Sequence, residues 1–479
     1  MNRLRLALLV FAAFIISIDF NIVYVALPDI GHELGFTAQS LQWVVSAYAV
    51  GFGGLLLLGG RAVDRLGARR MFVLGLAVFG LASLAGGLAS APGVLVGARV
   101  VQGTGGALLF PATLALINNT FAAGPARNRA LSLWGVAGST GAVVGPMAGG
   151  VITNFLGWEW VFFVNAPLTL AAVVAALRVL PADPGGYGWG GARWRAFDLP
   201  GALVATAGST LAVFGLASGP EAGWGSARGA GALALGGLLL ATFVLIERRS
   251  RDPLAPPSLL GVRSLVTIMA LIFVIMGTIN TMHYLFYIDV QEVLGYSALG
   301  AGLAFLPMSL MSIVGAAKLL PGLLSRLGMR GALFTGVLGA GLSMAAVSAG
   351  MSADGSYWLL LPGIVFLGLF AGMVYPMLFL AGGADVSPGE QGVASALVST
   401  SQQIGGAVGL AVLVAVANAG LDAGAGAVPA ADLVAGLRTA GWVAAAMTVA
   451  GAFLVLRLRR AEQPERQPAA AEMSVGPLP

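Results

Sequence analysis

The stretch "DRLGARR" at residues 64–70 recurs in altered form 261 residues later, as "SRLGMRG" at 325–331. Two further pairs of segments have nearly the same spacing, at offsets of 265 and 260: "GALLFPATLAL" (106–116) with "AGMVYPMLFLA" (371–381), and "TGAVVGPMAGG" (140–150) with "TSQQIGGAVGL" (400–410). A nearly constant offset shared by three pairs indicates an internal duplication. The chain is therefore predicted to consist of two homologous halves.

The residues around these repeats are unusually apolar. Of the 479 residues, 58% are hydrophobic and 9% are charged, whereas soluble domains contain roughly 25% charged residues. Because a helix needs about 20 apolar residues to cross a bilayer, we predict an all-α polytopic membrane protein with fourteen transmembrane helices. They are expected near 6–28, 41–60, 70–90, 93–118, 129–153, 158–178, 197–219, 229–246, 264–288, 298–323, 329–350, 357–381, 391–418 and 434–457.

The repeat offset places six helices in each half and leaves two between them. We predict an N-terminal six-helix bundle over 1–180, two inserted transmembrane helices with their linkers over 181–263, and a C-terminal six-helix bundle over 264–458. The polar, proline-rich tail over 459–479 is expected to be disordered. Two parallel repeats related by an axis along the membrane normal, with substrate bound near the midplane between them, form one known transporter architecture.

The basic residues predict the orientation in the membrane. An even number of crossings puts both termini on one side, and cytoplasmic loops retain Lys and Arg. With the N-terminus in the cytoplasm, all but three of the 25 basic residues lie on that side or at its membrane boundary; Arg228 and Arg438 lie outside and Arg99 lies within the membrane. Both termini are therefore predicted to be cytoplasmic, and the net charge of +5 reflects topology rather than a nucleic-acid surface.

Several chemistries are excluded by the residues present. The chain has no cysteine, which rules out disulfides and thiolate metal sites. His32 and His283 do not have metal-ligand spacing, and no nucleophile and base form a catalytic constellation. "GTGGALLFP" (103–111) is rich in glycine but lacks the Lys-Ser/Thr of a phosphate-binding loop. We expect no enzyme activity, no metal and no cofactor.

Several motifs in a fixed order resemble the Major Facilitator Superfamily, in particular its fourteen-helix drug:proton antiporter branch. They are "IDFNIVYVALP" (18–28), "WVVSAYAV" (43–50), "GGRAVDRLGARR" (59–70), "ARVVQGTGGALLFP" (98–111), "GAVVGPMAGG" (141–150), "WEWVFFVNAPL" (158–168) and "QEVLGYSALGAGLAFLP" (291–307). Departures occur at Asn21 and Tyr24, where the family usually has Thr and Asn, and at Glu159, where Arg is usual. The resemblance implies a monomeric transporter in a bacterial cytoplasmic membrane, driven by the proton gradient.

Two ionisable residues lie in apolar segments. Asp19 lies 13 residues from the predicted start of its helix, about 20 Å along it, and Arg99 lies about 9 Å from the opposite membrane surface. The family fold places these two helices side by side, and charges buried in membranes usually pair. We expect Arg99, helped by Asn21 and Gln102, to offset the burial of Asp19. Asp19 could then load and unload a proton; the alternative is a static pair that holds two helices together.

Two further motifs are candidates for conformational gating. The fifth predicted helix contains small residues that allow close helix packing and a proline that bends the axis: Gly141, Gly145, Pro146, Gly149 and Gly150. The loop motif contributes Asp64, Arg65, Arg69 and Arg70. By resemblance, Asp64 would contact a helix N-terminus and Arg127 or Arg129, closing the inner side while the cavity faces outward. The alternatives are helix packing alone for the glycines and positive-inside topology alone for the arginines.

Polar and aromatic residues on the predicted spans are candidates for substrate contact. Near the outer end of the seventh helix, His283, Tyr284 and Asp289 could contact a cationic or aromatic molecule, while Tyr287 is interpreted as a headgroup-level tyrosine. Weaker candidates lie on spans that line the cavity in the family: Asn21, Tyr24, Gln42, Tyr48, Gln102, Asn118, Asn280, Tyr375, Gln402 and Gln403.

The resemblance implies proton-coupled export of amphipathic or cationic drug-like molecules, such as antibiotics, by alternating access between the two bundles. Asp19 is the first candidate for the proton carrier and Asp289 the second. Two alternatives stay open. One is an uptake symporter or uniporter on the same fold, and the other is a membrane sensor or assembly protein that does not transport.

Overall fold

Helices form the regular secondary structure of the computed structural model, which describes residues 2–122, 124–183, 199–223, 225–250, 257–383, 385–387, 390–419 and 429–458, and no β-strand occurs among them. Since backbone groups in lipid must be satisfied within the segment, helices suit this composition. The elements are α1 (Asn2–Leu34), α2 (Trp43–Leu66), α3 (Ala68–Gly87), α4 (Pro92–Thr120), α5 (Pro125–Leu156), α6 (Glu159–Phe163), α7 (Asn165–Val179), α8 (Leu199–Ala222), η2 (Ala227–Gly231), α9 (Ala232–Arg249), α10 (Pro257–Leu260), α11 (Arg263–Ile288), η3 (Asp289–Val293), α12 (Ala298–Val314), η4 (Gly315–Leu319), α13 (Leu320–Gly350), α14 (Tyr357–Gly383), α15 (Gln391–Ala417) and α16 (Ala430–Val455).

Within the described ranges, twelve helical stretches are long and apolar enough to cross a membrane. The predicted all-helical, multi-span protein is thus confirmed. One stretch, Ala298–Gly350, is 53 residues long and contains a break at Gly328, where φ is +68°. This break separates the predicted helices 298–323 and 329–350. The first predicted central helix, 197–219, corresponds to α8, in which Leu203–Leu216 forms a shorter apolar helix.

Some boundaries differ from the prediction. The predicted helix 158–178 corresponds to α6 and α7, which together form one apolar stretch, Glu159–Val179, because Val164 between them keeps helical φ and ψ of −59° and −28°. The seventh helix continues beyond residue 288 as the π-helical segment η3, and the short helix α10 was not predicted. The tail 459–479 and most of both predicted linkers, at 184–198 and 251–256, lie outside the described residues.

The sequence repeat has a counterpart in the backbone. Gly67 lies between α2 and α3 with φ of +103°, and Gly328, 261 residues later, has φ of +68°. Glycine is favoured at both positions because an L side chain is strained there. Likewise Pro111 lies inside α4 and Pro376 lies inside α14. The two repeat segments therefore form the same kind of turn in each half.

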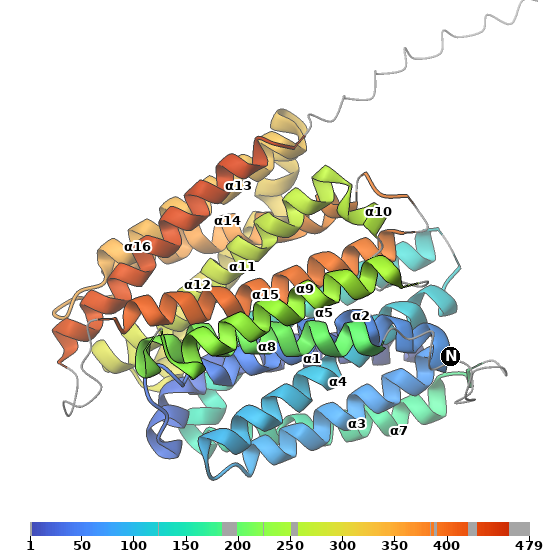
Figure 1. Cartoon of the computed structure of the whole chain (residues 1–479), viewed down its shortest axis with the longest axis horizontal. Coiled ribbons are helices and arrows are strands. Elements are labelled where there is room, and N and C mark those ends of the chain that lie inside the picture. Colours follow the sequence, from blue (N-terminus) through green and yellow to red (C-terminus); the bar gives the residue numbers. More distant parts are fainter. Residues whose placement is uncertain are drawn as a thin grey trace, which may run out of the picture.

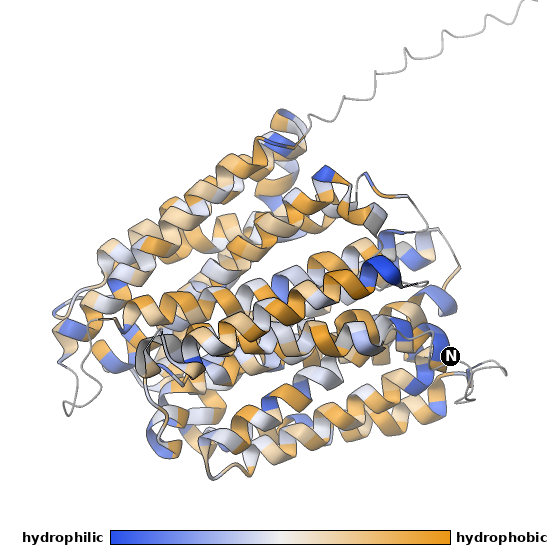
Figure 2. Ribbon diagram, viewed as in Figure 1, coloured by the Kyte–Doolittle hydropathy of each residue, from blue (hydrophilic) through white to orange (hydrophobic). Residues whose placement is uncertain are grey.

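The helices run side by side in two groups (Figure 1). The groups α1–α7 and α11–α16 meet chiefly through α2 with α15 and α5 with α12, and to a lesser extent through α1 with α11. Helix α8 packs on α9 and contacts both α2 and α15, so it touches both groups. Figure 2 shows apolar residues along the middle of the helices, with hydrophilic residues concentrated toward their ends. This distribution fits a bilayer around the bundle.

Hydrogen bonds join the two groups at the end where α1 terminates. His32 Nε2 lies 2.9 Å from Glu292 Oε1, and Gln291 Nε2 donates to the Val25 carbonyl at 3.0 Å. Asn418 Nδ2 donates to a Gln39 side-chain oxygen at 3.3 Å. The groups are therefore in direct contact at this end, which is called the closed end below.

The His32–Glu292 pair contributes little to this closure, because its side chains are 70% and 31% exposed. Exposed ion pairs typically stabilise by about 0–1 kcal/mol. We therefore expect His32→Gln to change the free energy of unfolding by less than about 1 kcal/mol and to leave transport unchanged. Thermal denaturation in detergent and a transport assay check this; a large loss of transport would show that the pair is a gate.

Candidate functional site

A charged network lies buried among α1, α3, α4 and α7. Asp19 on α1 is 0% exposed and Arg99 on α4 is 1% exposed, and Arg99 Nη1 donates to Asp19 Oδ2 at 2.9 Å. Asp19 Oδ1 accepts from Gln102 Nε2 at 2.7 Å and from Asn165 Nδ2 at 2.6 Å. Three donors, of which Arg99 carries a full positive charge, therefore satisfy both oxygens of the buried carboxylate.

Arg99 is also well satisfied. Its Nε donates to the Val44 carbonyl on α2 at 2.8 Å, and its Nη1 also donates to Gln102 Oε1 at 2.6 Å. The guanidinium carbon lies 4.5 Å from the centroid of the Tyr48 ring, a favourable cation–π distance. Arg99 therefore connects α1, α2 and α4 around a single charge, and its loss would affect all three helices.

The predicted pairing of Asp19 with Arg99 and Gln102 agrees with this geometry, but Asn21 does not take part as expected. Asn21 Nδ2 instead donates to the Ser17 carbonyl of its own helix at 2.8 Å. Two members of the network were missed: Asn165, and Ser83, which accepts from Gln102 Nε2 at 2.8 Å. The only sign of Asn165 and Ser83 in the sequence is that each is a polar residue within an apolar segment. All of these residues belong to the N-terminal group of helices.

An aromatic cluster lies where the two groups of helices meet. The Tyr24 ring centroid on α1 lies 5.9 Å from that of His283 and 6.4 Å from that of Tyr287, both on α11. Phe305 on α12 lies 5.1 Å from His283 and 5.3 Å from Tyr287. Tyr287 is 1% exposed, so its interpretation as a headgroup-level residue is wrong: it is buried against Tyr24 of the other half and Phe305 of its own half.

Several polar atoms in and near this cluster make no hydrogen bond within the described part of the chain. They are Tyr24 Oη, Tyr287 Oη, His283 Nε2 and Asp289 Oδ1. Asp289 is buried and begins the π-helical segment η3, a distortion that is frequent at functional sites. Tyr284 lies beside the cluster, 3.5 Å from the Ala38 carbonyl. Unsatisfied buried polar atoms are costly, so this region has capacity to bind a polar group or a proton.

The remaining cavity candidates are dispersed. Gln42 is buried at the start of α2 and donates to the Gln39 carbonyl. Gln403 faces Gly53 on α2, and Asn280 faces Gly406 within the C-terminal group. Gln402 and Tyr375 lie 3.5 Å apart, and Tyr375 is 45% exposed. Asn118 is exposed, and its carbonyl accepts from Arg127. These residues do not form one cluster.

The glycines of α5 serve two different contacts. A Cβ atom built on Gly141, Gly145 or Gly149 would lie within 2.8 Å of an atom of α1. A Cβ on Gly150 would lie 2.7 Å from the Ala298 carbonyl oxygen of α12 in the other group. The Pro146 carbonyl similarly lies against Gly302 of α12. Close helix approach therefore requires these glycines, and Gly150 is the one placed at the junction between the groups.

Among the described residues, the predicted contact between Asp64 and a helix N-terminus is not made. Asp64 is exposed, and the positive charges that influence it are those of Arg61 and Arg65 on its own helix. The N-terminus of α3 is instead capped by Asp183, which accepts from the backbone N–H groups of Arg69 and Arg70, both at 3.0 Å. Arg127 donates to the Phe121 and Asn118 carbonyls, and Arg129 is exposed.

A two-part bundle of membrane helices with a charged network buried in one part is the architecture of a membrane transporter. The family model of the Major Facilitator Superfamily matches residues 9–410, and the chain belongs to this family. The chain is 39% identical over 424 residues to the cephamycin export protein CmcT of Amycolatopsis lactamdurans, covering 85% of this chain and 84% of that protein. It is 38% identical over 416 residues to the puromycin resistance protein pur8 of Streptomyces alboniger, covering 85% and 80%.

Solved structures show the same fold. A mutant of the nucleoside transporter NupG superposes with a TM-score of 0.66 at 13% identity, covering 95% of this chain and 99% of that one. The human organic anion transporter MFSD10 gives a TM-score of 0.62 at 16% identity, with the same coverage. The predicted membership of the superfamily is thereby confirmed, and the family consists of transporters rather than enzymes.

Proposed function

We propose that the chain is a proton-coupled exporter of drug-like molecules. Several similar proteins are named for the export of, or resistance to, antibiotics, including cephamycin, puromycin and lincomycin. The observation that carries the proton-coupling part is the 2.9 Å contact between Asp19 and Arg99 in a fully buried network. An ionisable pair this deep in a membrane bundle is costly, and such residues usually serve transport or proton transfer. The proton gradient, without a cofactor, would drive the cycle.

The proposal includes a topology. We place both termini in the cytoplasm of a bacterium, with the protein in its cytoplasmic membrane as a monomer. Counting the break at Gly328 and including α8 and α9 gives fourteen crossings, as in the drug:proton antiporter branch, with six-helix bundles over 1–180 and 264–458 and the inserted pair between them. The closed end then faces outward and the substrate path faces the cytoplasm, a state in which the Asp64 contact would not be expected.

The proposed mechanism uses α1 as the connecting element. One face of α1 carries Asp19, another packs on the α5 glycines, and Tyr24 meets α11 of the other half. A proton on Asp19 would remove the charge that holds Arg99 and weaken three charge-assisted hydrogen bonds. The resulting shift of α1 would be felt at the α5 glycines and at the aromatic cluster. Proton binding would thus change how the two halves meet.

The aromatic cluster is the proposed substrate-binding surface. Its rings offer apolar and cation–π surface, and the unpartnered Tyr24 and Tyr287 hydroxyls could bond to a polar group of the ligand. The more dispersed polar residues would extend this surface along the path. A site of this kind favours amphipathic molecules that carry aromatic or cationic groups.

The direction of transport tests the proposal. Purified protein is reconstituted in liposomes with a defined orientation, an acid interior or exterior is imposed, and movement of labelled puromycin is followed. For an antiporter, puromycin moves opposite to the proton gradient and dissipates it. Movement of puromycin in the same direction as protons would establish the symporter alternative. Movement that does not depend on the proton gradient would establish the uniporter, and binding without movement would establish the sensor.

A further inference from the structure

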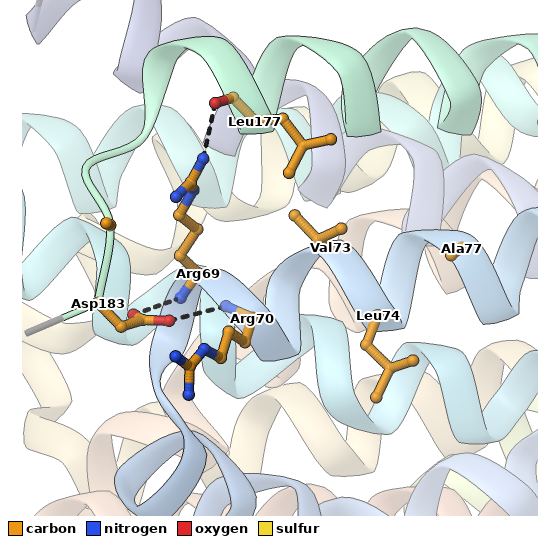
Figure 3. A pocket seen from close by; sticks show the side chains of 8 residues that line it. Arg69, Arg70, Val73, Leu74, Ala77, Leu177 and Asp183 are labelled. Atoms are coloured by element: carbon orange, nitrogen blue, oxygen red, sulfur yellow. Dashed lines mark hydrogen bonds between the residues drawn. The ribbon is translucent and has the colours of Figure 1, made fainter. Parts of the chain in front are cut away.

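The groove between α3 and α7 has the properties of a lipid site. A cavity of about 420 Å³ is lined by Val73, Leu74 and Ala77 of α3, by Leu177 of α7, and at its mouth by Arg69, Arg70, Ala182 and Asp183. Figure 3 shows the two arginines extending from the first turn of α3, with the apolar side chains further along the helix. Helices α3 and α7 form an outer edge of the bundle (Figure 1). The groove therefore faces the surrounding bilayer.

The chemistry changes along the groove as it does along a phospholipid. From Arg69 to Ala77 is eight residues, about 12 Å along a helix, and over this distance the lining changes from cationic to apolar. Leu74 is 42% exposed and Leu177 is 54% exposed, so both contact lipid chains in a membrane. The helix ends, where the arginines lie, are at headgroup level.

The mouth of the groove is positively charged although it includes one carboxylate. Asp183 uses both oxygens on the α3 backbone, and Arg69 and Arg70 line the groove beside it. Arg69 Nη2 donates to the Leu177 carbonyl at 2.6 Å. The buried Arg69 Nε has no acceptor within the described residues. A phosphate oxygen would supply that acceptor.

We propose that this groove binds one anionic phospholipid, with its phosphate at Arg69 and Arg70 and the first part of an acyl chain between α3 and α7. The ammonium of a zwitterionic lipid such as phosphatidylcholine would be repelled by the arginines. A bound lipid would connect α3 to α7 on the side of the N-terminal group away from the substrate path. This inference does not depend on the direction of transport or on proton coupling.

Thermal denaturation and native mass spectrometry of the full chain in detergent test the proposal. Phosphatidylglycerol and phosphatidylcholine with the same acyl chains are added at equal concentrations, and inorganic phosphate is added separately. We expect only phosphatidylglycerol to raise the midpoint temperature of thermal denaturation. In native mass spectrometry, we expect one phosphatidylglycerol molecule to stay bound to each protein molecule. An equal effect of phosphatidylcholine, or the same rise with inorganic phosphate, would overturn the proposal.

Three variants locate the effect. Arg70→Gln should weaken phosphatidylglycerol binding about fivefold, the expected effect of losing one cation near an anionic headgroup. Ala77→Phe should fill the apolar part and reduce binding without changing charge. Arg326→Gln is the matched control, because it removes the same charge at an exposed position of the corresponding loop in the second repeat, away from the groove. Equal losses in Arg70→Gln and Arg326→Gln would indicate non-specific charge attraction and contradict the proposal, whether or not Ala77→Phe folds.

Discussion

Asp19→Asn is expected to abolish proton coupling and to destabilise the protein by about 3–5 kcal/mol, the cost of breaking a buried ion pair by removing one partner. Asparagine fits the same space, but its amide cannot provide the negative charge that Arg99 contacts at 2.9 Å. Arg99 would be left as an uncompensated charge in the membrane. Transport measured in liposomes and denaturation in detergent would report the two effects separately.

A second substitution distinguishes the charge from the shape of the site. In Asp19→Asn/Arg99→Gln, no uncompensated charge remains, so we expect part of the lost stability to return while proton coupling stays absent. The difference between the double variant and the sum of the single variants measures the coupling of the pair. If the double variant were no more stable than Asp19→Asn alone, the burial of Arg99 would not be the source of the destabilisation.

Gly150→Leu is expected to reduce transport more than tenfold, a barrier change of about 1.4 kcal/mol, by preventing the two halves from meeting at the closed end. Any side chain at this position meets the Ala298 carbonyl oxygen, 2.7 Å from the Cβ position, and the Leu299 Cα at 3.1 Å. Both are backbone atoms, so no change of side-chain rotamer can relieve the clash. The closed end should therefore open in this variant.

The absence of native cysteine makes this opening measurable. A single reporter, Gln291→Cys, lies at the closed end, where Gln291 donates to the Val25 carbonyl. Its reaction with a membrane-impermeant maleimide should be faster in Gly150→Leu than in the otherwise unchanged protein. Gly138→Leu is the matched control on the same helix, because its Cβ position has no neighbour within 4 Å. The same labelling rate in both glycine variants would refute the assignment of Gly150 to the junction.

The pairing of Asp19 with Arg99 could be predicted because charges are rare in this chain and a buried charge needs a partner. Gln102 could be included because it lies one helical turn from Arg99. Asn165 could not, because no local pattern marks which face of its helix meets Asp19. The exact partner of such a residue depends on how α7 is placed against α1.

Contacts between distant segments were less predictable. Asp183 caps α3 from a loop 114 residues away from Arg69, and no local pattern marks it for that role. The stacking of Tyr24 and Tyr287 across the two halves depends on how the halves meet. Asp64 also depends on this arrangement, since the contact that the family resemblance implies for it belongs to a state in which the inner side is closed.

The most direct test of the account is proton release in liposomes containing a pH-sensitive dye, triggered by substrate, for the wild type, Asp19→Asn and Asp289→Asn. Asp289 is the alternative proton carrier, because it is a buried acid in the C-terminal group and its Oδ1 has no hydrogen-bond partner among the described residues. The account predicts that release is lost in folded Asp19→Asn and retained in Asp289→Asn. Release that survives Asp19→Asn and disappears in Asp289→Asn would contradict it, and would reduce Asp19 to a structural partner of Arg99.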